Sequence, residues 1–362
     1  MNAQARVDAL QRRLDTENIP AIMISDVSNV RYLTGFENVF DDHANVALAV
    51  TPTLTIIYTD SRYAEAIEAA AAGTTWTLVV PRETLYIDLC EDLEREGIEY
   101  LAIESSVPYG RFKFICERFG GNVQAVDQWV EKLRQVKEAE EIDRIARAAA
   151  LTDRAFDYLV RTLEPGMTEL QIALAAEVFM RENGSEGVAF PIIAAGGPNS
   201  SRPHAQCTDR PISEGDFLTI DMGARVQGYC SDMTRTVVVG KASERQIDVY
   251  EAVRQANEAA TLQVRGGLPG SQIDAVAREL LVSKGYGDYF GHGLGHGVGL
   301  DVHELPRVGP SARDSVLAGS IITIEPGIYI PEFGGVRIED LLVVEEGGYR
   351  VLSTSPRTLI EI

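Results

Sequence analysis

The chain contains little cysteine, few basic residues relative to acidic ones, and no long hydrophobic run. With 33 basic against 54 acidic residues the net charge is −21, which argues against nucleic acid or an anionic membrane as a partner. The longest apolar runs, such as 21–24 and 320–324, are too short to span a bilayer. The N-terminal stretch predicts a charged amphipathic helix and does not resemble a signal peptide.

The cysteines are too few and too scattered to form a disulfide framework or a zinc site. The chain has four cysteines, without any C-x-x-C pair: Cys90, Cys116, Cys207 and Cys230. We expect reduced, mostly buried thiols and a cytoplasmic protein.

The N-terminal third alternates short apolar segments with helical patterns. The segments AIMIS, NVALAV, TIIYT, TWTLVV and YLAIES predict strands, and residues 83–96 predict a helix. This order is typical of an α/β domain with a mixed sheet. A charged helical stretch, VEKLRQVKEAEEID, begins near residue 130 and carries i, i+4 pairs of opposite charge. We therefore predict two domains, 1–129 and 130–362.

The second domain contains an internal repeat. Residues 215–221 (GDFLTID) and 319–325 (GSIITIE) each contain a glycine, an apolar strand ending in Thr-Ile, and an acid. Each copy continues through a turn to another strand carrying a second acid, Asp232 or Glu339. Two helical patterns precede each copy, at 137–162 and 168–183, and at 243–265 and 270–283. The repeat predicts a pseudo-twofold, curved antiparallel sheet backed by four helices, with the two acids of each hairpin about 5 Å apart.

Histidine is scarce but concentrated. The chain has five histidines, and three of them lie within residues 291–304, GHGLGHGVGLDVHE. The glycines between them would let the backbone approach a site closely, because no side chain obstructs it. This segment therefore predicts a functional site.

The repeated acids together with a histidine indicate a metal site. Four clustered carboxylates cannot all ionise in a partly buried site unless positive charge neutralises them, and two divalent cations would do so. The alternative is that the acids face solvent or pair with nearby bases, namely Arg225, Arg235 and Arg337. An oxygen-rich donor set with one imidazole suits Mn²⁺, or Co²⁺ or Zn²⁺ by substitution. Two metals about 3.5 to 4 Å apart could share a bridging water and generate a hydroxide nucleophile, which is typical of hydrolases.

From about residue 130 to the end, the chain resembles the pita-bread metallopeptidases (family M24), in the aminopeptidase P and prolidase (Xaa-Pro dipeptidase) branch. The stretches that carry the resemblance are VEKLRQVKEAEEIDRIARAA, GGPNSSRPH, GDFLTIDMGARVQGYCSDMTRT, GHGLGHGVGLDVHELPRV and TIEPGIYIPEFGGVRIED. The resemblance implies an α/β creatinase/prolidase-like N-terminal domain followed by an α+β pita-bread (creatinase/aminopeptidase) catalytic domain. The N-terminal half matches less specifically.

The resemblance implies five metal ligands. Asp232 and Glu339 would bridge both ions, Asp221 would complete one site, and His296 with Glu325 would complete the other. Glu325 would also handle the proton of the bridging hydroxide. Methionine aminopeptidases usually lack the N-terminal domain, and creatinase lacks the metal ligands. All five ligands are present here, so the resemblance disfavours a non-catalytic metal- or peptide-binding protein.

Five further residues match pocket positions of this branch. His204, His292 and His303 would hold the scissile carbonyl and stabilise charge at the tetrahedral stage. Tyr329 and Arg337 would support the pocket, with Arg337 orienting a ligand carboxylate. Each of these residues could instead have a purely structural role.

The resemblance implies peptides with proline in second position, whose tertiary amide has no N–H. Arg307 lies where prolidase-like members carry a basic group suited to a free C-terminal carboxylate, which favours a dipeptidase; a simple surface cation is the alternative. An aminopeptidase P-like enzyme of broader or longer specificity remains open. The resemblance also implies a homodimer, in which a loop near His43 and Asp42 would reach toward the neighbouring subunit's pocket. A solvated loop is the simpler interpretation of those two residues.

Overall fold

The computed structural model describes residues 2–362. The chain forms two compact units, Met1–Arg134 and Gln135–Ile362, here called the N-terminal unit and the C-terminal unit. Among the described residues, no helix combines the length and the apolar character needed to cross a membrane.

The N-terminal unit is an α/β fold around a six-stranded sheet, as predicted. The strand order is β4-β3-β2-β1-β5-β6, with β1 antiparallel to β2 and parallel to β5. The strands are β1 (Ile22–Ile24), β2 (Val46–Val50), β3 (Thr55–Thr59), β4 (Thr77–Val79), β5 (Tyr100–Glu104) and β6 (Asn122–Val126). The helices are α1 (Ala3–Glu17), α2 (Val27–Thr34), α3 (Ala64–Ala71), α4 (Leu85–Arg95), α5 (Tyr109–Arg118) and α6 (Trp129–Arg134). All residues of β1 and β2 are buried, which explains their continuous apolar sequences.

Helix α2 was missed by the sequence patterns for a physical reason. Six of its eight residues are buried, so it shows no polar face opposite an apolar one. Its start is marked instead by Asp26, whose side chain accepts a hydrogen bond from the Asn29 N–H as an N-cap.

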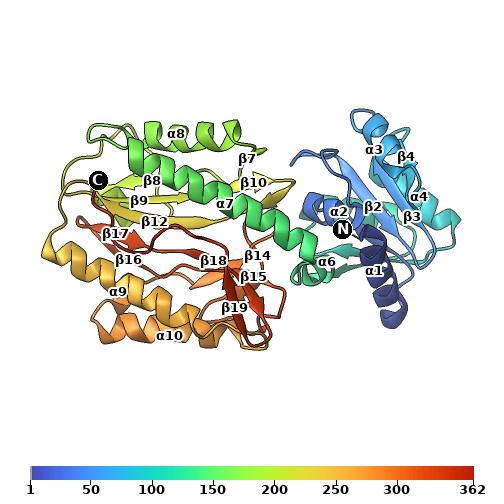
Figure 1. The fold of residues 1–362 in the computed structure, drawn as a ribbon. Coiled ribbons are helices and arrows are strands. Elements are labelled where there is room, and N and C mark those ends of the chain that lie inside the picture. The colour runs from blue at the N-terminus through green and yellow to red at the C-terminus, as the bar shows by residue number, and fades with distance from the viewer. Residues whose placement is uncertain (1) are drawn as a thin grey trace. The chain divides into compact units, whose positions relative to one another are not determined.

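The C-terminal unit consists of two helix pairs with strands between them (Figure 1). The helices are α7 (Ala139–Thr162), α8 (Glu169–Glu182), α9 (Glu244–Thr261), α10 (Gly270–Ser283) and the 3₁₀ turns η1 (Gly197–Ser201) and η2 (Gly287–Tyr289). The first strands are β7 (Gly187–Val188), β8 (Ile193–Gly196), β9 (Phe217–Met222), β10 (Ala224–Val226), β11 (Tyr229–Cys230) and β12 (Met233–Val238). The later strands are β13 (Gly295–Gly297), β14 (Glu304–Val308), β15 (Ile321–Ile324), β16 (Gly327–Ile330), β17 (Gly334–Arg337), β18 (Asp340–Glu345) and β19 (Gly348–Val351).

The predicted repeat is present in this unit. Strands β9 and β12 form an antiparallel pair in a sheet of order β12-β9-β8, and β15 and β18 form the corresponding pair in the order β14-β13-β15-β18-β19. The helices α7 and α8 share a buried apolar cluster with β9 and β12, and α9 and α10 share another with β15 and β18. Each helix pair therefore packs on a different apolar cluster, although Phe217 of β9 and Val238 of β12 belong to the second one.

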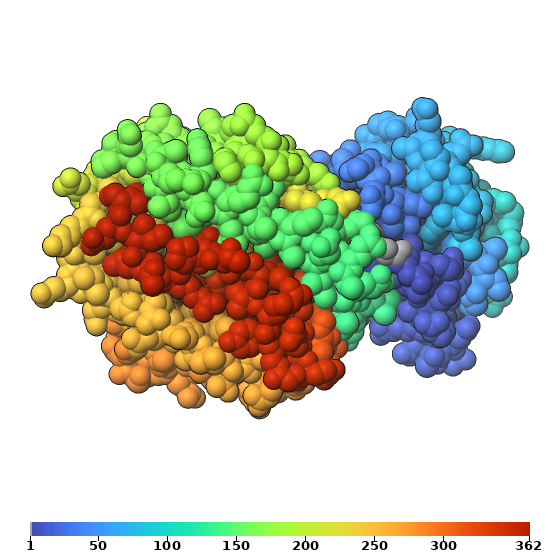
Figure 2. Space-filling model, viewed as in Figure 1, coloured from blue at the N-terminus to red at the C-terminus, as the bar shows by residue number. Residues whose placement is uncertain are grey.

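The last residues of the chain pack along helix α7. In Figure 2 they form a red band next to the green surface of that helix. The carboxylate of Asp153 in α7 accepts hydrogen bonds from the backbone N–H and the hydroxyl of both Thr354 and Ser355. Near the C-terminus, the N–H of Val238 donates to the carbonyl of Ile360, so the end of the chain lies alongside the edge strand β12.

Candidate metal centre

The first repeat supplies two of the predicted ligands. Asp221 lies in β9, and Asp232 immediately precedes β12. The two strands pair with Asp221 opposite Thr234, and residues opposite each other in a sheet share a face. Asp232 is two residues from Thr234 and therefore belongs to the same face. Both acids are buried.

The second repeat supplies the other two acids. Glu325 directly follows β15, and Glu339 directly precedes β18. Because Ile324 pairs with Asp340, both glutamates lie at the same end of this hairpin. Glu339 is almost fully buried, and Glu325 is partly exposed.

His296 comes from the neighbouring strand β13, and its flanking glycines explain how it fits there. A Cβ on Gly295 would lie 2.0 Å from the Thr323 carbonyl oxygen, and one on Gly297 would lie 2.1 Å from that of Leu305. No side chain is compatible with such distances. The glycines in this segment therefore allow β13 to approach its neighbours closely enough to bring His296 to the acids.

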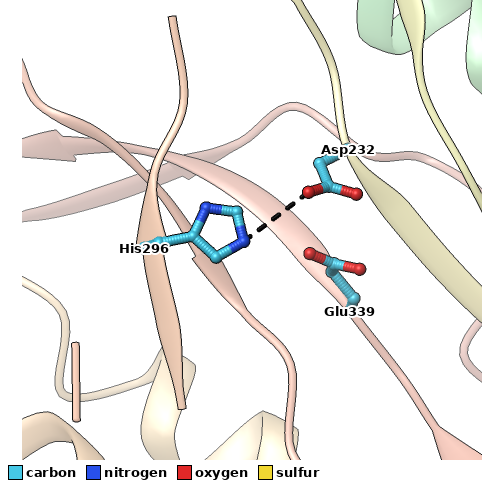
Figure 3. Close-up of side chains that lie close together, drawn as sticks. All are labelled: Asp232, His296 and Glu339. Carbon is cyan, nitrogen blue, oxygen red and sulfur yellow. Dashed lines mark ion pairs between the residues drawn. The ribbon is translucent and has the colours of Figure 1, made fainter. Parts of the chain in front are cut away.

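Three of these side chains point into a common space (Figure 3), and their candidate ligand atoms all lie within 4.8 Å of one another: Asp232, His296 and Glu339. The Nε2 atom of His296 lies 3.6 Å from Asp232 Oδ2 and 3.2 Å from Glu325 Oε1. This group of side chains has the composition and spacing of a metal site.

Burial and mutual repulsion make the acids costly to ionise without a cation. Burial raises the pKa of Asp232 and of Glu339 well above their ordinary values, and the negative charges of neighbouring acids raise both further. Burial also raises the pKa of Asp221, against the opposing effect of Arg337. The site therefore needs positive charge to hold all its carboxylates ionised.

His296 and Glu325 form the one strongly paired couple in this group of five side chains. Burial lowers the pKa of His296, but the hydrogen bond to Glu325 and the charges of the acids outweigh it and raise the pKa to about 9. Burial likewise opposes ionisation of Glu325, but the hydrogen bond from His296 prevails and lowers its pKa to about 2. In the metal-free protein a proton on His296 therefore supplies part of the missing positive charge.

Two carboxylate oxygens at the site are buried without a hydrogen-bond partner, Asp221 Oδ1 and Glu339 Oε1. The other oxygen of each acid is held: Arg337 Nη2 donates to Asp221 Oδ2 at 2.6 Å, and Thr234 Oγ1 donates to Glu339 Oε2 at 2.7 Å. A buried oxygen without a partner is unfavourable unless a ligand satisfies it. Hard oxygen donors with one imidazole fit a divalent cation such as Mn²⁺.

Of the three bases considered as alternatives to metal, Arg337 does pair with one of the acids. Its ion pair with Asp221 is buried. Arg235 instead pairs with Asp340 at 2.7 Å. Pairing with a local arginine thus accounts for one of the four acids.

The acids open into a cavity of about 470 Å³ within the C-terminal unit. All five predicted ligands and the three predicted pocket histidines line it, together with Arg337. The remaining lining residues are Phe190, Pro191, Ile193, Pro203, Ala205, Gln206, Gly293 and Gly295. Charged and apolar side chains therefore both line the cavity.

The pocket histidines lie in different environments. The Nδ1 atom of His292 lies 2.7 Å from the Gly293 carbonyl oxygen, and its Nε2 lies 2.9 Å from the Tyr329 hydroxyl. The carbonyl can only accept, so in the neutral ring the proton is on Nδ1 and Nε2 accepts from Tyr329. The ring of His303 lies with its centre 4.3 Å from that of His296. Burial lowers the pKa of His292 and of His303, which favours neutral rings at pH 7.

The other predicted residues lie outside the cavity lining. Tyr329 is buried behind it, where its hydroxyl accepts from Arg337 Nη1 at 3.0 Å. Arg307 is exposed on β14, opposite His296 in the strand pairing. His43 is exposed in the N-terminal unit, and Asp42 beside it forms an ion pair with Arg31 at 3.0 Å.

Sequence reasoning missed Thr234 and Glu169. Thr234 contacts Glu339 directly, and its only signal in the sequence was its place two residues after Asp232. Glu169 is fully buried, and its carboxylate accepts hydrogen bonds from Gly196 N–H and from the N–H and hydroxyl of Thr208. It therefore holds both ends of the segment that carries His204. In the sequence it looked like an ordinary acid in the first turn of a helix.

Comparison with known proteins agrees with this geometry. The model of metallopeptidase family M24 matches residues 143–346, and that of the creatinase/prolidase N-terminal domain matches residues 6–136. The chain is 35% identical over 348 residues to an Xaa-Pro dipeptidase of Pyrococcus horikoshii, covering 96% of each chain. The chain belongs to metallopeptidase family M24, with a creatinase N-terminal domain and a pita-bread catalytic domain.

Solved structures match over the full length. The Xaa-Pro dipeptidase from Bacillus anthracis superposes with a TM-score of 0.94 at 32% identity, covering 100% of both chains. The X-Pro aminopeptidase from Thermotoga maritima superposes with a TM-score of 0.88 at 33% identity, covering 98% of this chain and 99% of that one.

Proposed function

We propose that the chain is an Xaa-Pro peptidase with a preference for dipeptides, which hydrolyses the bond between an N-terminal residue and proline with the help of two divalent cations, Mn²⁺ foremost. The observation that carries the proposal is that the five side chains Asp221, Asp232, His296, Glu325 and Glu339 line one cavity. The similarity to Xaa-Pro dipeptidases supports the substrate class.

The five side chains have separate roles in this proposal. Asp232 and Glu339, which come from different repeats, would contribute to both cation sites. Asp221 would complete one cation site, and His296 with Glu325 would complete the other. Bound cations would supply a hydroxide at neutral pH and polarise the scissile carbonyl. Glu325 would take the proton of that hydroxide and pass it to the proline nitrogen as the C–N bond breaks.

The pocket side chains position the peptide. His292 and His303 have lowered pKa values, so both rings stay neutral and add no charge. His303 offers its N–H to the scissile carbonyl, whereas His292, whose N–H is used by the Gly293 carbonyl, contacts the peptide through its ring. His204 lies in the segment 196–208, which Glu169 holds at both ends, and it also contacts the scissile carbonyl in this proposal. Arg337 orients the Asp221 carboxylate, and Tyr329 orients His292.

The preference for dipeptides rests on Arg307. It lies opposite His296 in the β13–β14 pairing and its side chain is exposed. Side chains of opposite residues share a face of the sheet, so Arg307 projects on the same side as His296. A guanidinium there would bind the free carboxylate of an Xaa-Pro dipeptide in a bidentate pair.

A second candidate is an aminopeptidase P-like enzyme that cleaves longer peptides after the first residue. The similarity to the Thermotoga maritima X-Pro aminopeptidase favours it. Cleavage assays on the Mn²⁺-loaded and Co²⁺-loaded protein with Ala-Pro, Ala-Pro-Ala and Ala-Ala separate the two. We expect cleavage of Ala-Pro alone. A preference for Ala-Pro-Ala would support the second candidate.

A matched pair of variants tests whether the site is catalytic. Asp232→Asn removes one bridging carboxylate and should abolish cleavage, whereas Glu346→Gln changes an exposed acid and should leave the rate unchanged. If the unchanged protein binds two Mn²⁺ ions and cuts none of the three peptides, the chain is a non-catalytic metal- or peptide-binding protein.

We further propose that residues 1–129 and 130–362 are separate domains of a cytoplasmic homodimer. The family models, which match 6–136 and 143–346, support the presence of two domains, and the four free cysteines suit a reducing compartment. The loop of His43 is held by Asp41, which accepts from the His43 N–H at 2.8 Å and from the Tyr63 hydroxyl at 2.7 Å. Such a loop could present His43 to a neighbouring subunit's pocket. Sedimentation analysis tests the dimer, and a monomer of full activity would contradict this role.

A further inference from the structure

Buried threonines of the first repeat connect it to the second. Thr219 of β9 donates through its hydroxyl to the Gly335 carbonyl at 3.2 Å. The Thr236 hydroxyl of β12 accepts from the N–H of Arg337 and donates to its carbonyl, each at 3.1 Å. Strands β12 and β17 belong to different sheets. Side-chain hydroxyls therefore connect these two strands in place of the backbone hydrogen bonds that connect neighbouring strands of one sheet.

Thr234 is a third buried threonine that connects the two repeats, and unlike Thr219 it contacts a side chain of the metal site. It is fully buried. Its Oγ1 donates to Glu339 Oε2 at 2.7 Å and accepts from Arg337 Nε at 2.9 Å. Its backbone carbonyl also accepts from the Glu339 N–H at 3.1 Å. Glu339 is therefore held at both its backbone and its side chain by one residue of the other repeat.

The hydroxyl has a single proton, so the direction of these bonds is determined. The Nε–H of Arg337 can only donate, and a carboxylate can only accept. When Glu339 is ionised, as cation binding requires, the Thr234 proton therefore lies toward Glu339. Because Arg337 Nη2 donates to Asp221 Oδ2 at 2.6 Å, a continuous chain runs from Asp221 through Arg337 and Thr234 to Glu339. It links one acid of the first repeat to one acid of the second.

This chain holds one oxygen of each of the two acids and leaves the other without a partner. Glu339 Oε1 and Asp221 Oδ1 are buried without a hydrogen-bond partner, whereas the opposite oxygen of each acid is held. Figure 3 shows the Glu339 carboxylate directed toward the same space as Asp232 and His296. A carboxylate anchored at one oxygen is less free to rotate away from its neighbours, so less of its motion has to be lost when a cation binds.

We propose that Thr234 is a positioning residue of the metal centre, which fixes the Glu339 carboxylate and couples it through Arg337 to Asp221, so that ligands from both repeats are ordered before a cation binds. This inference rests on the metal centre proposed above. Thr234 does not itself bind the cation or the peptide; it acts through Glu339.

The test compares the loss of one hydroxyl at two buried threonines. Thr234→Val replaces the hydroxyl with a methyl group of similar size, and Thr219→Val makes the same change at a residue that contacts no ligand among the described residues. Calorimetric titration of the metal-free protein with Mn²⁺ is the readout, with peptide cleavage measured separately. We expect Thr234→Val to weaken Mn²⁺ binding about 10- to 100-fold, as loss of a hydrogen bond to a ligand typically does. Thr219→Val should change the Mn²⁺ affinity less than about threefold.

The conservative variant Thr234→Ser keeps the hydroxyl and should restore Mn²⁺ affinity to within about threefold of the unchanged protein. If Thr234→Val does not fold, Thr234→Ala replaces it, and the proposal requires at least about tenfold weaker binding by alanine than by serine. Equal affinities of the valine or alanine variant and the unchanged protein would overturn the proposal, as would an equal loss in Thr219→Val.

The two proposals fail in distinguishable ways. If the unchanged protein binds Mn²⁺ but cleaves no peptide, the proposed peptidase function fails and the positioning role of Thr234 is still judged by the titrations. If the protein cleaves Ala-Pro and Thr234→Val binds Mn²⁺ normally, only the role of Thr234 fails. If the unchanged protein does not bind Mn²⁺, both are overturned.

Discussion

Replacing Arg337 with methionine should destabilise the metal-free protein severely. The guanidinium is buried and donates four hydrogen bonds: to Asp221 at 2.6 Å, Thr234 at 2.9 Å, Tyr329 at 3.0 Å and the Pro203 carbonyl at 3.1 Å. Methionine has a comparable length but no donor. The change leaves the Asp221 carboxylate buried without its counter-charge and the Tyr329 and Thr234 oxygens each without one donor.

The size of the loss follows from the burial of the pair. Removing one partner of a buried ion pair costs about 3 to 5 kcal/mol, because the other charge stays buried and uncompensated. For a domain the size of the C-terminal unit, about 1 kcal/mol corresponds to roughly 2 to 4 °C in melting temperature. The expected decrease is therefore about 6 to 20 °C.

Scanning calorimetry of the EDTA-treated protein measures this decrease, with Arg147→Met as the matched control. Arg147 forms an ion pair with Asp143 one helical turn away at 3.1 Å, and its side chain is 50% exposed. Such exposed pairs contribute about 0.3 to 0.5 kcal/mol, so the control should melt almost like the unchanged protein. If Arg337→Met lost no more than the control, Arg337 could not be the counter-charge of Asp221.

Three further predictions concern other charged groups. Arg307→Ala should raise KM about tenfold for Ala-Pro, equivalent to about 1.4 kcal/mol, and leave KM for Ala-Pro-Ala nearly unchanged. Steady-state kinetics measure both values. Equal effects on the two peptides would exclude binding of the dipeptide's carboxylate by Arg307. Lys137→Met should lower the free energy of unfolding, measured in urea, by about 3 to 5 kcal/mol, because Lys137 and Glu304 form a buried ion pair at 2.6 Å. The double variant with Glu304→Leu should recover most of this loss. An unchanged urea midpoint in the single variant would contradict the prediction. In EDTA, the His296–Glu325 pair should stabilise the fold fully between pH 4.5 and 6.5, the ordinary pKa values of the two groups. The raised pKa of His296 means that this stabilisation is lost as the pH rises through about 9, and the lowered pKa of Glu325 means that it is lost as the pH falls through about 2. Melting temperatures measured across this range should decline above pH 6.5 in the unchanged protein and not in His296→Gln.

Much of the site could be predicted because its elements are local in sequence. An apolar strand ending in an acid is visible within seven residues, and its second occurrence at 319–325 is enough to indicate a repeat. The glycines around His296 are likewise a local signal, which the structure explains by the close approach of neighbouring backbones. Residue type and spacing were sufficient here because strand periodicity and the lack of a side chain act within one segment.

The sequence could not show how the carboxylates are held. Thr234 and Glu339 are separated by 105 positions, yet the hydroxyl of one holds an oxygen of the other at 2.7 Å. Nothing around Thr234 distinguishes it from Thr219, which among the described residues makes no contact with a proposed metal ligand. Which hydroxyl reaches the site depends on how β12 meets the second repeat.

The sequence by itself determined the fold class, the two hairpins with their acids, and the histidine segment, since these depend on propensity and periodicity along short stretches. The tertiary structure alone decided that Asp232, His296 and Glu339 converge within 4.8 Å. It also decided that Arg337 neutralises Asp221 while Arg235 pairs with Asp340. The reason is physical: burial, charge repulsion and hydrogen-bond direction depend on distances between segments far apart in the chain, and packing sets those distances.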